Sequence, residues 1–124
     1  MESADSCAVF VVEDDPIIAF DLESMLEESG VGEIRVFRDN ASALAAIETR
    51  TPDYAILDWK LAAGTSIETA AMLRSLGVPV AFVTGYGEHV PLPPALADCP
   101  IFSKPVDRRL LAAFVACAKP REGA

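Results

Sequence analysis

Several polar or charged side chains follow closely after short apolar runs of the sequence, where each run ends. They are Glu13, Asp14, Asp58, Thr84 and Lys104. A lone carboxylate in an apolar interior costs several kcal/mol, so Asp58, which closes the run 54–57, is expected at the exit of a strand. The other four side chains are the candidate partners that would share its charge.

The charges of this set indicate a chemistry. Carboxylates held close together repel one another unless a cation lies among them. A hard divalent ion that prefers oxygen ligands, Mg²⁺ above all, would neutralise them. A carboxylate beside such an ion can attack a phosphoryl group and form an aspartyl phosphate. Lys104 and the ion would then balance the phosphoryl charge, and Thr84 would donate a hydrogen bond.

The apolar runs predict the strands that position these residues. Runs 8–12, 54–57 and 80–83 are apolar throughout, which is typical of strands covered by helices on both faces. Residues 34–37 and 101–102 predict two shorter strands, and helical spacing of apolar residues follows most of the five. Alternating strands and helices predict a parallel sheet with right-handed crossovers and helices on both faces. Such sheets bind ligands beyond the carboxyl ends of their strands, where the polar set would meet.

Local signals mark where the helices begin and end. Asp15 before Pro16 is typical of an N-cap, Asp39 or Asn40 caps the second helix, and Gly30 ends the first. Residues 65–68 match a capping box for the third helix, after a loop over residues 59–64. The prolines between residues 88 and 100 allow only a short or irregular fourth helix.

Composition narrows the class of protein. The 124 residues are 52% hydrophobic and carry a net charge of −9, which favours one packed domain and disfavours a nucleic-acid surface. The acidic N-terminus predicts no signal peptide, and no apolar run approaches the ~20 residues of a membrane helix. Cys7, Cys99 and Cys117 lack metal-ligand spacing and are expected to be buried thiols in a reducing cytoplasm.

The motifs resemble those of a response-regulator receiver domain of bacterial two-component signalling, over nearly the whole chain. Residues 11–16 resemble the family's acidic motif, Leu57-Asp58 its phosphoacceptor, Thr84 its switch hydroxyl and Lys104-Pro105 its Lys-Pro pair. Residues 82–87 are also similar to an alphaproteobacterial, often single-domain subgroup with a Phe-Ala-Thr-Gly-Tyr signature. The resemblance implies a flavodoxin-like, doubly wound (βα)5 fold with strand order 2-1-3-4-5. It also implies a single domain over residues 1–124, with a core at about 7–119 and no effector domain.

The resemblance also implies roles for individual residues. Asp58 would accept a phosphoryl group from the phosphohistidine of a sensor kinase or phosphotransferase. Asp14 and Asp58 would bind Mg²⁺ directly, with the backbone carbonyl of Lys60 completing the site and Glu13 acting through a water molecule. The Lys60 side chain would tune the phosphate lifetime, and Lys104-Pro105 would be a cis peptide.

Two departures from the family pattern concern the output of the switch. Ile101 stands three residues before Lys104, where the family usually has an aromatic residue, and the usual Met-Pro after the phosphoacceptor is absent. We hypothesise that Tyr86, two residues past Thr84, takes over part of the aromatic residue's role. Unchanged partner affinity in both Tyr86→Phe and Tyr86→Ala would contradict this hypothesis.

The resemblance predicts a switch protein rather than an enzyme, with slow self-dephosphorylation at most. Its output would be a changed surface that binds a downstream protein, without nucleic acid or membrane. One alternative is a degenerate receiver that binds partners without phosphate. Another is a small phosphatase with an aspartate nucleophile, but that chemistry needs a second acid two residues after the nucleophile, where this chain has Lys60.

Overall fold

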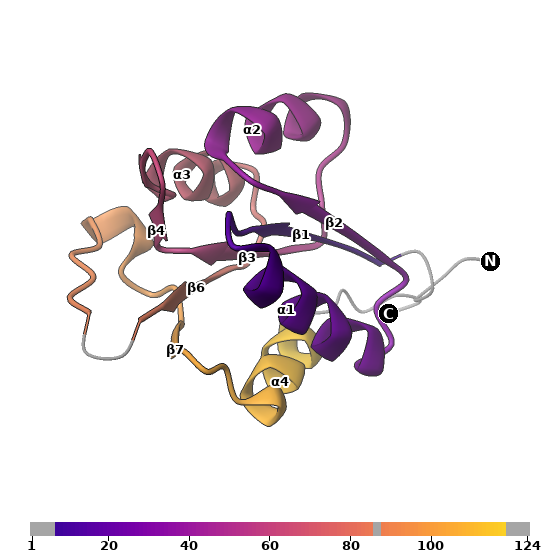
Figure 1. Cartoon of the computed structure of the whole chain (residues 1–124). Helices are drawn as coiled ribbons and strands as arrows, with labels where there is room; N and C mark the ends of the chain where they lie inside the picture. The colour runs from indigo at the N-terminus through magenta and orange to yellow at the C-terminus, as the bar shows by residue number, and fades with distance from the viewer. Residues whose placement is uncertain (1–6, 86–87, 119–124) are drawn as a thin grey trace.

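The computed structural model describes residues 7–85 and 88–118, and its centre is a parallel sheet (Figure 1). The sheet has the strand order β2-β1-β3-β6-β7, which confirms the predicted order 2-1-3-4-5 once the strands of a separate small sheet are set aside. Its strands are β1 (Ala8–Val12), β2 (Glu33–Phe37), β3 (Tyr54–Asp58), β6 (Val80–Thr84) and β7 (Ile101–Ser103). All four pairings between neighbouring strands are parallel.

In the described part of the chain, α-helices cover both faces of the sheet, as expected for a doubly wound fold (Figure 1). The helices are α1 (Pro16–Glu28), α2 (Asn40–Thr49), α3 (Ile67–Ser75) and α4 (Arg108–Ala118). Helices α2 and α3 lie on one face, and α1 and α4 on the other. The predicted short fourth helix is a single 3-10 turn, η2 (Pro94–Leu96), because prolines remove the amide donors a longer helix needs.

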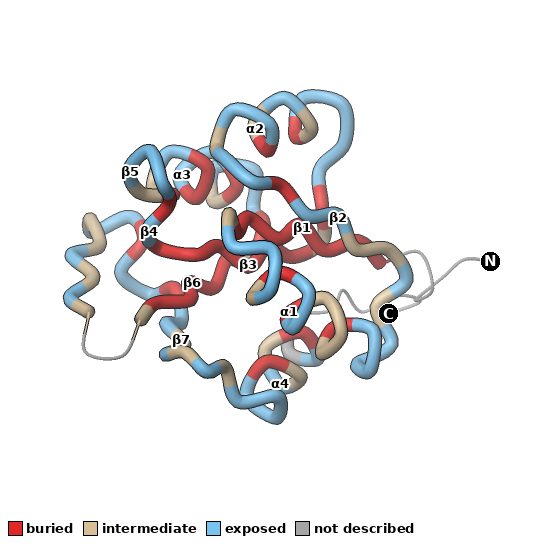
Figure 2. Tube along the Cα trace, viewed as in Figure 1, coloured by how far each residue is buried: buried red, intermediate tan, exposed pale blue. Residues whose placement is uncertain are grey.

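The central strands are buried on both faces, as their continuous apolar sequences predict. Every residue of β1, β3 and β6 is buried, whereas the edge strands β2 and β7 are partly exposed (Figure 2). Alternate residues of the central strands enter two separate cores. Phe10, Leu57 and Phe82 pack on the α2–α3 side, while Val9 and Ile56 pack on the α1–α4 side.

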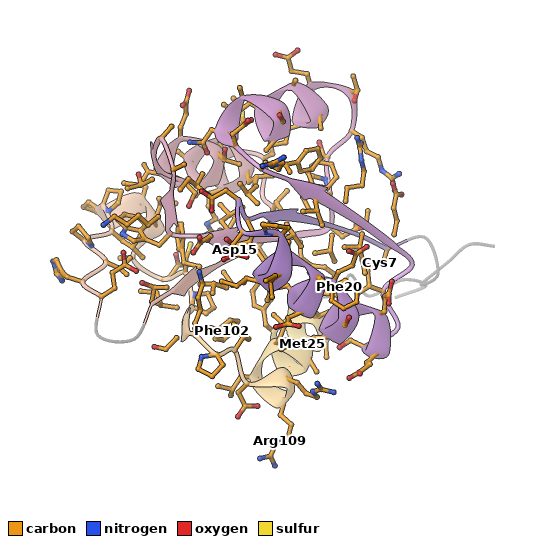
Figure 3. The ribbon with its side chains drawn as sticks, viewed as in Figure 1. Cys7, Asp15, Phe20, Met25, Phe102 and Arg109 are labelled. Carbon is orange, nitrogen blue, oxygen red and sulfur yellow. The ribbon has the colours of Figure 1, made fainter. Side chains whose placement is uncertain are left out.

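The first two helices begin at predicted caps. The Asp15 carboxylate accepts hydrogen bonds from the amides of Ile17 and Ile18, so it fixes the start of α1 directly after β1 (Figure 3). Asp39 caps α2 by accepting from the amide of Ser42. Asn40 instead bonds across to the α3 side, where its amide donates to the Thr65 carbonyl at 2.9 Å.

Two local predictions around the third helix are wrong. The segment expected to be a loop contains β4 (Lys60–Leu61) and β5 (Gly64–Thr65), which form a short antiparallel hairpin. Gly64 has φ +131°, a conformation that side-chain-bearing residues rarely adopt, and this permits the hairpin. The capping box does not form: Ser66 is the N-cap residue of α3 and makes no side-chain capping bond.

The cysteines and the lengths of the helices can be compared with the expectations from the sequence. Cys7 and Cys99 are buried, whereas the Cys117 side chain lies outside what the structure describes. Within residues 7–85 and 88–118, every helix is too short or too polar to cross a membrane.

Replacing Asp15 by alanine is expected to destabilise the protein by ~0.5–2 kcal/mol, because two amides of the first turn of α1 lose their acceptor. Urea unfolding of the metal-free protein would measure this change. Asp15→Asn should retain most of the stability, since the asparagine oxygen still accepts. Asp21→Ala, at an exposed position within α1, is the matched control. Equal stabilities of Asp15→Ala and this control would contradict the capping role.

Candidate functional site

Four strands deliver polar residues to one edge of the sheet, as the sequence predicts. Glu13 follows β1, Asp58 is the last residue of β3, Thr84 is the last of β6 and Lys104 follows β7. Pairing places Asp58 beside Val83 and Thr84 beside Ser103. Because all of these strands run parallel, their carboxyl ends lie at the same edge.

The Lys104 ammonium lies between two buried carboxylates. Its Nζ is 3.1 Å from Asp58 Oδ1 and 3.5 Å from Glu13 Oε1. The Lys104 backbone is also held, since its amide donates to the Thr84 carbonyl at 2.8 Å. The peptide bond from Lys104 to Pro105 is cis, which confirms the expectation drawn from the resemblance.

Glu13 is the most deeply buried acid of the site, with only 1% of its surface exposed. Its Oε2 accepts from the Asp15 amide at 3.0 Å. The buried Oε1 forms the ion pair with Lys104 but accepts no hydrogen bond from any other residue within 7–85 and 88–118. Burial, reinforced by the charge of Asp58, raises its pKa to about 7, against the opposing effects of the Asp15 amide and Lys104. The site therefore holds a carboxylate that sheds its proton only near neutral pH.

Asp58 and Lys104 shift each other's pKa values. Burial raises the pKa of Asp58, although the hydrogen bond and charge of Lys104 oppose the shift. Burial alone would lower the pKa of Lys104, but the hydrogen bond and charge of Asp58 outweigh it, so the pKa is raised. Lys104 is thus held in its charged form at neutral pH, and it partly offsets the two carboxylates.

Asp14 completes a group of three acids suited to a cation. Carboxylate oxygens of Glu13, Asp14 and Asp58 all lie within 4.8 Å of one another. Asp14 Oδ2 also accepts from the Ala62 amide of the hairpin at 2.7 Å. An all-oxygen set of this kind fits a hard divalent ion such as Mg²⁺. One of its oxygens, the buried Glu13 Oε1, has only the ion pair with Lys104 in the part of the chain that the structure describes.

The Thr84 hydroxyl has a partner that the sequence did not reveal. It donates to Glu88 Oε1 at 2.6 Å, and the Gly85 amide donates to the same oxygen at 2.9 Å. These two hydrogen bonds lower the pKa of Glu88. The only sequence signal for this contact is an acid four residues after Thr84, which is too common a spacing to have been informative.

Comparison with known proteins decides the family. The model of the response regulator receiver domain matches residues 9–116. The chain belongs to this family. Its receiver is 37% identical over 84 residues to the phyllosphere-induced regulator PhyR of Methylorubrum extorquens, covering 65% of this chain but only 32% of PhyR.

Solved structures agree with this assignment. The receiver matches SdrG from Sphingomonas melonis with a TM-score of 0.78 and 31% identity, covering 94% of this chain and 98% of SdrG. It matches a PhyR variant from Bartonella quintana, described as an anti-anti-sigma factor, with a TM-score of 0.75 and 25% identity. That match covers 91% of this chain and 48% of the PhyR chain.

Of the remaining predicted residues, the structure describes Lys60 and Ile101. Lys60 is exposed at the start of β4, two residues beyond Asp58, and its charge acts on Glu88. Ile101 is 43% exposed on the edge strand β7. Tyr86 lies outside the described residues, so its predicted role in the switch stays a hypothesis.

Glu13→Gln is expected to stabilise the metal-free receiver at pH 8 and to change it little at pH 5. Since the native pKa of about 7 exceeds the ordinary 4.5, the native state keeps a proton that the unfolded chain releases. The stability that this group contributes is therefore complete below pH 4.5 and is lost as the pH rises through 7. Glutamine cannot ionise, so urea unfolding with a chelator present should show a gain of roughly 1–3 kcal/mol at pH 8.

The exposed Glu48→Gln on α2 is the control for this experiment and should show no pH-dependent difference from the wild type. Destabilisation by Glu13→Gln of equal size at both pH values would contradict the prediction. That result would mean that Glu13 acts through its contacts rather than through the cost of its buried charge.

Proposed function

We propose that the receiver is a phosphoacceptor switch in two-component signalling, with Asp58 as the residue that takes the phosphoryl group. The observation that carries the proposal is the Lys104 ammonium 3.1 Å from Asp58 Oδ1 at the sheet edge, with two further carboxylates beside it. An ammonium there can balance the charge that a phosphoryl group brings. The family match supports this assignment.

In the proposed transfer, a carboxylate oxygen of Asp58 attacks the phosphorus of a phosphohistidine on a kinase or phosphotransferase. A bond from phosphorus to oxygen forms as the bond from phosphorus to nitrogen breaks, and the imidazole takes back the electron pair and a proton. Asp58 suits this role because Lys104 orients the carboxylate while burial limits its solvation. The phosphoryl charge would then be met by the Lys104 ammonium and the Thr84 hydroxyl.

The acid group would hold Mg²⁺ through Asp14 and Asp58 directly, through the Lys60 carbonyl, and through a water molecule on Glu13. The bound ion would supply charge neutralisation for the phosphoryl oxygens. Asp14 Oδ2 accepts a hydrogen bond from the Ala62 amide, so an ion held by this carboxylate would lie close to the β4–β5 hairpin.

The output we propose is a changed protein-binding surface rather than a catalysed reaction. The partners would be a histidine kinase or phosphotransferase upstream and a protein downstream, in the cytoplasm and without nucleic acid. Asp58 would lose its phosphate slowly, at a rate tuned by the exposed Lys60 side chain. Residues 82–87 support membership of the Phe-Ala-Thr-Gly-Tyr subgroup. Two similar PhyR structures are described as an anti-anti-sigma factor and as a stress response regulator, which suggests a role in stress signalling for this receiver.

Beryllofluoride, which mimics a phosphoryl group on aspartate, tests this function directly. With Mg²⁺ present, the wild type should bind it, and Asp58→Asn should lose binding by at least roughly 100-fold, because the amide cannot act as the anionic ligand. Fluorine NMR of bound beryllofluoride is the direct readout. Trp59 fluorescence is a second, indirect one, since its ring is buried against Phe82, with ring centroids 5.7 Å apart.

Asp98→Asn is the matched control, because this exposed aspartate precedes β7 at the opposite edge of the sheet. It should bind beryllofluoride as the wild type does. Absence of binding by the wild type would contradict the proposal and favour a degenerate receiver that acts without phosphate. Repeated turnover of small phosphate esters would instead favour the phosphatase alternative.

A further inference from the structure

Glu88 accepts hydrogen bonds from two donors at the carboxyl end of strand β6. The Thr84 hydroxyl at 2.6 Å and the Gly85 amide at 2.9 Å both donate to its Oε1, and the Glu88 amide in turn donates to the Gly85 carbonyl at 3.0 Å. Two donors converging on one anionic oxygen form a small anion site. In the described structure, the carboxylate of the chain itself fills that site.

We infer that Glu88 is an internal competitor of the phosphoryl group, an autoinhibitory contact that holds Thr84 in the unphosphorylated state. The inference rests on the proposed function. It adds that the Glu88 side chain must release Thr84 before Thr84 can donate to the phosphoryl group. A hydroxyl has one proton to donate, so Thr84 cannot donate to Glu88 and to a phosphoryl oxygen at once. Phosphorylation would therefore break the contact between Thr84 and Glu88.

Charge favours the exchange once Asp58 is phosphorylated. The ammonium groups of Lys104 and Lys60 both act on the Glu88 carboxylate, and Lys104 also pairs with Asp58. A phosphoryl group carries a charge of about −2 and replaces the single negative charge of the Asp58 carboxylate. The added negative charge draws Lys104 toward the phosphoryl group and repels Glu88. The released carboxylate can turn to water at little cost because Glu88 is only partly buried.

Release of Glu88 would change the packing of the segment that follows it. Glu88 begins the segment that continues through Val90 and Leu92, whose side chains are partly buried against the core on the α2–α3 side. Movement of the Glu88 backbone would alter how these two side chains pack. The contact would thus link the occupancy of the Asp58 site to a segment that packs on the α2–α3 side of the sheet, without any role for residue 101.

Beryllofluoride titration at saturating Mg²⁺ tests the inference through Glu88→Gln. Glutamine keeps the size of the side chain but loses its charge, so Thr84 and Gly85 should be released more easily. The half-saturating concentration should fall by roughly three- to tenfold, as expected when a competing state is depopulated. Glu48→Gln, which removes the same charge from α2, should stay within about twofold of the wild type. In the Thr84→Val background, the effect of Glu88→Gln should shrink, since the shared hydrogen bond is already gone.

Each outcome of the titration is decisive. An affinity of Glu88→Gln equal to or weaker than that of the wild type overturns the inference while leaving the proposed function intact. A gain of the same size in Glu48→Gln also overturns it, because the effect would then be general electrostatics. Failure of every protein to bind beryllofluoride overturns the proposed function and the inference with it.

Discussion

The ion pair between the half-buried Lys104 and the buried Asp58 is the interaction on which the site depends. Charged groups lose much of their hydration at the sheet edge, and their attraction offsets that loss only when the geometry is good. The geometry here is held by backbone: Asp58 ends β3, and the Lys104 amide donates to the Thr84 carbonyl at the end of β6. A cis peptide follows at once. Strand register, rather than side-chain flexibility, therefore sets where the ammonium lies.

One ammonium does not neutralise this edge, and the excess negative charge explains the rest of the site. Glu13 reduces the repulsion among the carboxylates by keeping a proton up to about pH 7. Asp14 is stabilised by the hydrogen bond that it accepts from the Ala62 amide. Both are ways for carboxylates to coexist without a cation. The metal-free receiver is therefore less stable at neutral pH than it would be without the buried charge of Glu13. In the proposed function, this loss of stability accompanies a site that would attract a divalent ion and a phosphoryl group.

The sequence predicted those features that depend on local pattern. Continuous apolar runs identified the strands, and alternation with helical segments gave the parallel sheet whose carboxyl ends gather Glu13, Asp58, Thr84 and Lys104. The cap at Asp15 was also readable. Three features could not be predicted from the sequence: the β4–β5 hairpin, the contact between Asp14 and Ala62, and the contact of the Glu88 carboxylate with Thr84. Each of these depends on a backbone turn or on a partner brought near by the fold, and such contacts leave no periodic signal in the residues involved.

The departure at Ile101 changes how the state of Asp58 can be transmitted. Side chains alternate across a strand, so an aromatic residue shifted by one position faces the other side of the sheet. That is the situation of Phe102, whose ring packs on Phe114 of α4 at a centroid distance of 6.2 Å, in the α1–α4 core. The Ile101 side chain has no aromatic ring and no group that could form a hydrogen bond with the Thr84 hydroxyl, so its position cannot depend on such a bond. In the proposed switch, a polar route from Thr84 would instead pass through its hydrogen-bond partner, which is Glu88.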